Sequence, residues 1–126
     1  MKPMRSAFLA TAFVAILGAC GGTAASQETA DPADADVTIT SVDMEFDQTT
    51  IAVAAGESFT LALVNEDAVP HNVSIYTDSS ASEDLFVGDV ITETTVVYDV
   101  PALEPGEYFF RCDLHPEMTG TLIVEG

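Results

Sequence analysis

Three residues near the C-terminus carry side chains that bind soft metal ions. Cys112, His115 and Met118 stand three apart in the segment "YFFRCDLHPEMTG", although the whole chain has only 2 cysteines, 2 histidines and 4 methionines. A thiolate, an imidazole and a thioether together favour soft or borderline metals over magnesium or calcium. The other histidine, His71 in "VPHNVSIY", would add a second imidazole if the fold brings it close.

The spacing of these residues also fits one face of a helix, but the surrounding sequence favours a strand followed by a loop. Pro116 lacks an N–H group and disfavours helical geometry at His115. Before it, Phe110 and Cys112 fall on one face of an alternating aromatic segment, as they would in a strand. We therefore expect Cys112 to end a strand, and His115 and Met118 to lie on the loop that follows.

Two imidazoles, one thiolate and a weak axial thioether are the ligand set of blue-copper sites. The thiolate binds both oxidation states of copper, imidazoles suit Cu(II), and a distant thioether favours Cu(I). Zinc competes for cysteine and histidine ligands, but it prefers four strong donors and a thioether is a poor zinc ligand. The sequence therefore predicts a site for one copper ion, with the ligands His71, Cys112, His115 and Met118.

From Val37 onward the sequence has the pattern of short β-strands. Runs rich in Val, Ile, Thr, Tyr and Phe alternate apolar with polar residues, and Gly, Pro, Asn and Asp separate them. No stretch after residue 36 has a helical period, and Gly120 would let the chain turn into the last strand. About eight short strands predict an all-β fold, a β-sandwich or a barrel. The expected strands lie within residues 37–42, 50–57, 58–65, 71–76, 85–91, 94–100, 106–112 and 120–125.

The segment "GEYFFRCDLHPEMTGTLIVEG", together with "PHNV" upstream, resembles the cupredoxin family of type 1 (blue) copper proteins. The resemblance covers residues 37–126. The C-x-x-H-x-x-M spacing is similar to the short ligand loop of amicyanin, whereas plastocyanins have a longer gap between His and Met. The resemblance implies an eight-stranded Greek-key β-sandwich, which agrees with the strand pattern.

The resemblance also assigns roles to residues around the ligands. The backbone N–H of Asn72 would bond the thiolate sulfur, and its side chain would tie the two ligand segments together. The carbonyl of Pro70 would face the far axial side of the metal. Electrons would pass through the exposed edge of His115, inside a contact patch formed with apolar neighbours such as Val69 and Pro116.

The first 20 residues have the pattern of a bacterial export signal. Two basic residues precede an uncharged apolar run that is too short to span a bilayer. The run ends in "LGAC", which resembles the lipobox of bacterial lipoproteins; ordinary cleavage near "TAAS" is the alternative. We expect a signal peptide at residues 1–19, then the lipidated Cys20 and a flexible acidic tether through residue 36, and the copper domain at 37–126. The domain would face the periplasm or the cell exterior.

A lipid on Cys20 would leave Cys112 as the only thiol of the mature chain. It could not then form an internal disulfide, although disulfides are common in exported proteins. A disulfide between Cys20 and Cys112 is the alternative, and it would tie a flexible tail into the metal loop.

The acidic composition restricts the choice of partners. All 21 acidic residues lie after Cys20, and Arg111 is the only basic residue there. A domain with this negative charge is expected to bind nucleic acid and anionic lipid surfaces poorly. We expect a monomer that meets a redox protein with a basic docking surface; a generally acidic, salt-adapted surface is the alternative.

Two functions fit these observations. One is a membrane-tethered extracytoplasmic electron carrier that cycles between Cu(I) and Cu(II). The other is copper handling, as a chaperone, store or accessory protein that supplies copper to a partner enzyme. After Cys20 the chain has only Met44 and Met118 and no histidine- or methionine-rich tail, which favours the carrier. An enzyme is not expected, because the ligand set leaves no open position for a substrate.

Overall fold

The computed structural model describes residues 31–126. The predicted signal peptide at residues 1–19, the Cys20 lipidation site and most of the predicted tether lie outside the described residues. Within residues 31–126, no helix combines the length and the apolar character needed to cross a membrane.

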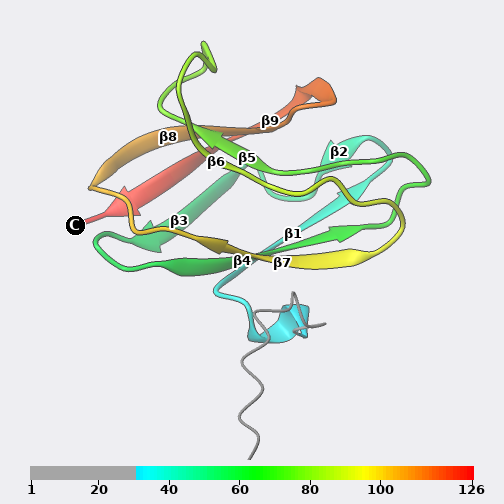
Figure 1. Cartoon of the computed structure of the whole chain (residues 1–126), viewed down its shortest axis with the longest axis horizontal. Coiled ribbons are helices and arrows are strands. Elements are labelled where there is room, and N and C mark those ends of the chain that lie inside the picture. Colours follow the sequence, from blue (N-terminus) through cyan, green and yellow to red (C-terminus); the bar gives the residue numbers. More distant parts are fainter. Residues whose placement is uncertain (1–30) are drawn as a thin grey trace, which may run out of the picture.

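Nine β-strands in this part of the chain form two sheets that pack as a β-sandwich (Figure 1). One sheet has the strand order β2-β1-β4-β7, and the other has the order β3-β9-β8-β5-β6. The predicted all-β sandwich is therefore confirmed. The strands are β1 (Val37–Val42), β2 (Glu45–Phe46), β3 (Thr50–Ala54), β4 (Phe59–Asn65), β5 (Ser74–Tyr76), β6 (Asp84–Val87), β7 (Thr95–Val100), β8 (Gly106–Cys112) and β9 (His115–Glu125), and the short 3₁₀ helix η1 (Pro32–Asp34) precedes them.

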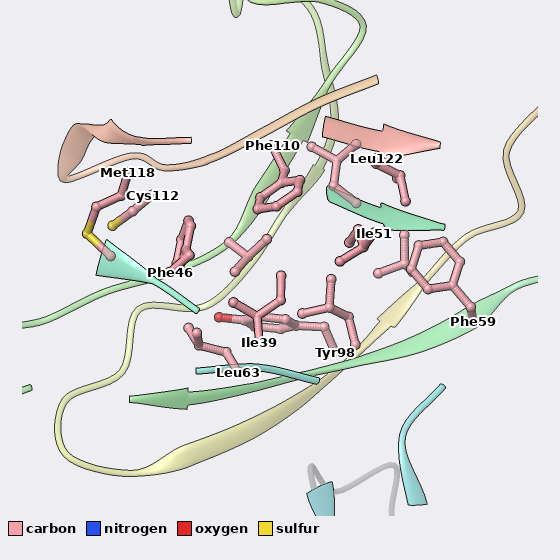
Figure 2. Packing of buried hydrophobic residues seen from close by; sticks show 14 of the residues in the cluster. Ile39, Phe46, Ile51, Phe59, Leu63, Tyr98, Phe110, Cys112, Met118 and Leu122 are labelled. Carbon is pink, nitrogen blue, oxygen red and sulfur yellow. The ribbon is translucent and has the colours of Figure 1, made fainter. Parts of the chain in front are cut away.

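The alternation of apolar residues places one face of each sheet in the core. In β4, Phe59 and Leu63 are buried together, and in β8 Phe110 and Cys112 are buried. Figure 2 shows these side chains meeting between the sheets, with Cys112 and Met118 at one end of the core. Each large apolar side chain that is fully buried contributes about 1.5–3 kcal/mol to folding, and Cys112 and Met118 belong to this buried group.

The strand that the sequence pattern missed is β2. Its two residues are too few for alternation to be visible, and it pairs with β1 across a turn at Asp43 and Met44. Both turn residues have positive φ, at 53° and 63°, as in a two-residue hairpin of type I′. Phe46 of β2 reaches the core, where its ring centroid lies 5.8 Å from that of Phe110.

The prediction that His115 and Met118 lie on a loop is wrong, because β9 already begins at His115. Only a two-residue turn separates the strands, and Cys112 pairs directly with His115. The register of the pairing shifts beside Cys112, so residues 116–118 form a bulge. Pro116 is tolerated in this strand because a bulged residue needs no ladder hydrogen bond.

The last residues of the predicted tether are packed on the domain. Asp36 accepts hydrogen bonds from the backbone N–H of Thr60 at 2.8 Å and from its hydroxyl at 3.1 Å. The hydroxyl of Thr38 donates to the carbonyl of Pro32 at 3.0 Å, and η1 contacts β4 and β7. The ordered body therefore starts before Val37.

Gly120 has a different role from the predicted turn. It lies inside β9, opposite Phe110 of β8, and it is not among the glycines with positive φ. A Cβ atom at this position would overlap the Phe110 ring. The glycine therefore provides the space in which this buried aromatic ring lies, directly beside the Cys112 end of the strand.

We expect Gly120→Ala to lower the free energy of unfolding by about 1–3 kcal/mol, because the added methyl group overpacks the core. Urea denaturation of the metal-free protein measures this loss. The double variant with Phe110→Leu should show a smaller penalty from Gly120→Ala, since the overlapping ring is gone. Strictly additive losses would show that the ring is not the cause.

Candidate metal centre

The side chains of His71, Cys112 and His115 converge at one end of the sandwich. Their ligand atoms all lie within 4.8 Å of one another. Cys112 Sγ is 3.6 Å from Nδ1 of His71 and 3.6 Å from Nδ1 of His115. The centroids of the two imidazole rings are 4.7 Å apart. Because both Nδ1 atoms face the sulfur, one metal ion could be bound by all three side chains.

Met118 lies beside this cluster. Its side chain is 3% exposed and belongs to the same buried group as Cys112. Figure 2 shows the side chains of Met118 and Cys112 at the same end of the core, near Phe46. The fold therefore brings all four residues of the predicted ligand set to the same end of the core.

The backbone of the segment between β4 and β5 fixes His71. Its N–H donates to the carbonyl of Ile91, and the N–H of Ile91 donates back to the carbonyl of His71, both at 2.9 Å. The buried side chain of Asn65 braces the same segment, since its amide donates to the carbonyls of Val69 and Ile91, again at 2.9 Å. These hydrogen bonds fix the position of His71, which is far from His115 in the sequence.

Asp67 fixes the orientation of the His71 ring. Nε2 of His71 lies 2.8 Å from Oδ2 of Asp67, so Nε2 carries the proton and Nδ1 presents its lone pair toward the sulfur. The same carboxylate accepts the backbone N–H groups of Asp43 at 2.8 Å and Met44 at 3.1 Å. Burial alone would raise the pKa of Asp67, but these hydrogen bonds, first that from His71, lower its pKa below the ordinary value.

Asn72 joins the two segments that carry the cluster. Its backbone N–H donates to Cys112 Sγ at 3.5 Å. Its side-chain carbonyl accepts the N–H of Asp113 at 2.8 Å, and its amide donates to Oδ2 of Asp113 at 3.0 Å. The structure therefore contains both kinds of hydrogen bond that the resemblance implied for Asn72.

Asp113, in the turn between β8 and β9, is hydrogen-bonded to several polar side chains on the outside of the hairpin. Its carboxylate accepts the hydroxyl groups of Ser74 and Tyr76. Arg111 Nε lies 3.2 Å from the same carboxylate, and its guanidinium lies 4.9 Å from the centroid of the Tyr76 ring. Burial alone would raise the pKa of Asp113, but the hydroxyl, amide and guanidinium donors lower it, so this carboxylate is ionised at neutral pH.

The outer side of the cluster is reached through His115, which is half-buried. Around it, Val69 is 37% exposed and Leu114 is 43% exposed, and Pro70 and Pro116 are exposed as well. These residues form an apolar surface over the one ligand that is not fully buried. The axial role of the Pro70 carbonyl stays a prediction.

Sequence reasoning missed the two carboxylates that organise the site, Asp67 and Asp113. Each had a signal in the sequence, because one lies four residues before His71 and the other lies between Cys112 and His115. The sequence does not reveal the hydrogen-bond partners of these carboxylates. Asp67 is bonded by the β1–β2 turn and Asp113 by β5, and both elements are distant in the sequence. Arg111, the only basic residue after Cys20, is bound to Asp113.

The chemistry of the donors fits a copper ion. The set contains one thiol, two imidazoles and one thioether, which suit copper in both oxidation states. Cys112 is a free thiol within the described residues and is completely buried. None of the described side chains has a buried nitrogen or oxygen atom left without a hydrogen-bond partner, so the surroundings of the four residues are already fully arranged.

Sequence comparisons match the chain to a family of proteins. The family model described as "Cupredoxin-like domain" matches residues 9–124. Amicyanin from Paracoccus versutus is 33% identical, over 98% of this chain and 97% of its own length. Amicyanin-alpha from Methylorubrum extorquens is 31% identical, over 92% of this chain and 98% of its own length.

Comparisons of structure give the same result. The crystal structure of amicyanin from Paracoccus versutus superimposes with a TM-score of 0.57 at 34% identity, covering 75% of this chain and 84% of that one. Auracyanin from Roseiflexus castenholzii has a TM-score of 0.64 at 18% identity, covering 71% of this chain and 96% of that one, and it shows the likeness of fold alone. The chain belongs to the cupredoxin family.

Proposed function

We propose that this protein is a type 1 copper protein that carries single electrons between redox partners. The observation that carries the proposal is the convergence of one thiol and two imidazole Nδ1 atoms within 4.8 Å, at a buried end of the core. Bound copper would supply the redox chemistry by cycling between Cu(II) and Cu(I). The strong ligands would be Cys112 and the two histidines, and Met118 would be the axial ligand. Auracyanin A, another structure with this fold, is described as a "blue" copper protein.

The chain's own contribution is to hold the ligands in one arrangement. His71 is fixed by its pairing with Ile91 and by Asp67, and Cys112 is fixed by its pairing with His115 and by the N–H of Asn72. A site that is already arranged needs little movement when the charge of its ion changes. Complete burial of His71 and Cys112 also keeps water from the thiolate side of the site.

Electrons would enter and leave through His115, because it is the ligand that combines partial exposure with an apolar surround. Val69 and Leu114 give this surface an apolar centre. The strongly acidic composition of the chain suits a partner whose docking surface is basic. This docking mode rests on the exposure of the histidine edge and on the composition of the chain.

Copper handling is the competing function. Full burial of Cys112 and His71 favours an ion that stays bound, whereas a donor protein must release Cu(I) to an acceptor. If copper in both oxidation states stays on the protein when a competing chelator is added, the result supports the carrier. An enzymatic role has no support here, because the four donors close the site to a substrate.

Cys112→Ser should abolish the intense visible absorption that we expect of the copper-loaded protein, because that band requires a copper–thiolate bond. Visible and EPR spectra of the wild-type and variant proteins measure this directly. Met118→Leu is the matched control and should keep the band, since it leaves the thiolate in place. A colourless or loosely bound copper in the wild-type protein would overturn the proposed function.

Asp67→Asn should raise the reduction potential by tens of millivolts, on the order expected when a negative charge near the metal is removed. The charge of Asp67 favours Cu(II) through the His71 ring, so its loss favours Cu(I). Voltammetry checks the change. Glu66→Gln, which removes the same charge from an exposed neighbour, is the control; an equal shift in both variants would exclude a specific role for the Asp67–His71 contact.

We further propose that the domain is tethered to a membrane by a lipid on Cys20, which rests on "LGAC" after the apolar run. In a bacterial host, labelled palmitate should be incorporated into the full chain, and the protein should partition with membranes. Cys20→Ala should lose both properties while Cys112→Ala keeps them. A wild-type protein without label would instead support ordinary cleavage near "TAAS".

A further inference from the structure

The two methionines in residues 31–126 line a single surface pocket. This pocket has a volume of about 370 Å³ and lies where β2 contacts β9. Its floor contains Met118 and Phe46, which are 3% and 7% exposed, whereas Met44 at its edge is 36% exposed. Two carboxylates complete the wall, and the polar members are Glu45, Thr49, Glu117 and Thr119.

The pocket contains one of the predicted copper ligands, Met118. Met118 lines the pocket, and its side chain lies at the same end of the core as Cys112 (Figure 2). A metal ion in this pocket would therefore be separated from the thiolate by one flexible thioether side chain.

The backbone of Met44 adopts a conformation that costs conformational energy for a residue with a long side chain. Its φ of 63° lies in the left-handed region, which glycine and asparagine favour and larger side chains avoid. The turn is held by Asp67, which accepts the N–H groups of Asp43 and Met44. Because Asp67 also bonds His71, one carboxylate holds both the backbone of Met44 and the ring of a predicted copper ligand.

We propose that this pocket is an uptake site for Cu(I), in which the Glu45 and Glu117 carboxylates attract the ion and the Met44 and Met118 thioethers bind it before it passes to Cys112. Thioethers select Cu(I) over Cu(II) and over zinc, and the two carboxylates attract the cation. No electron is transferred in this step; the ion exchanges one set of ligands for another, and the Cys112 thiol releases its proton as it binds the metal. The inference rests on the proposed copper centre.

The test measures loading of the metal-free full-length protein without oxygen. Cu(I) is presented as its bicinchoninate complex, and the loss of colour of that complex gives the rate of transfer. Met44→Leu, which conserves volume, should slow this transfer several-fold. Loading with Cu(II), the visible spectrum and the reduction potential of the loaded protein should stay as in the wild type.

Two further variants separate chemistry from folding. Met44→Gly removes the thioether and also relieves the left-handed backbone, so it should be at least as stable as the wild type and still load Cu(I) slowly. The pair Glu45→Gln and Glu117→Gln should slow Cu(I) transfer more than the pair Glu66→Gln and Glu93→Gln, which removes the same charge outside the pocket.

Binding can also be observed directly. In protein already loaded with Cu(I), a further equivalent of Cu(I) should shift the NMR signal of the Met44 methyl group. Wild-type loading rates in Met44→Leu, equal slowing of Cu(I) and Cu(II), or a Met44 methyl signal that does not move would each overturn the uptake site. Failure of the copper centre itself is distinguishable, because the wild-type protein would then lack the visible band.

Discussion

The structure of the site depends on the hydrogen bonds between Asn72 and Asp113. Asn72 precedes β5 and Asp113 follows β8, and their amide, carbonyl and carboxylate groups bind each other directly. This tie places the N–H of Asn72 on Cys112 Sγ and holds the His71 segment against the β8–β9 hairpin. The pairing of β5 with β8 joins the same two segments, and the Asn72–Asp113 bonds extend this connection to the ligands themselves. A buried polar contact of this kind is stable because each of its groups has a partner.

The two carboxylates near the ligands work in different ways. Asp113 lies on the outside of the hairpin and is neutralised by donors from β5 and by Arg111, so it mainly fixes the position of the turn. Asp67 bonds Nε2 of the His71 ring, so it places a negative charge directly behind a predicted metal ligand. The first is a structural anchor, and the second is the one expected to tune the proposed copper site. The sequence shows both only as acidic residues among many.

The fold and the ligand set could be predicted from the sequence because they depend on local patterns and rare residues. The alternation in β4 and β8 identifies their buried faces, and scarce cysteine and histidine identify the cluster. The bulged hairpin at Pro116, the two-residue strand β2 and the space at Gly120 could not be predicted, because they depend on which residue lies across from which. The same holds for Asp67, whose partners come from a turn more than twenty positions earlier in the chain.

The packing of Asp36 on Thr60 fixes the end of the domain at which the N-terminal segment joins it. β1 and β4 run parallel, from Val37 beside Leu61 to Ser41 beside Asn65. Asp36 therefore enters at one end of these strands, and Asn65 braces the His71 segment at the other, about 15 Å away for a strand rise of about 3.3 Å per residue. A chain anchored through its N-terminus would hold the domain by the end remote from His115. The metal face would then point outward, open to partners that diffuse in solution as well as to those beside it on the membrane.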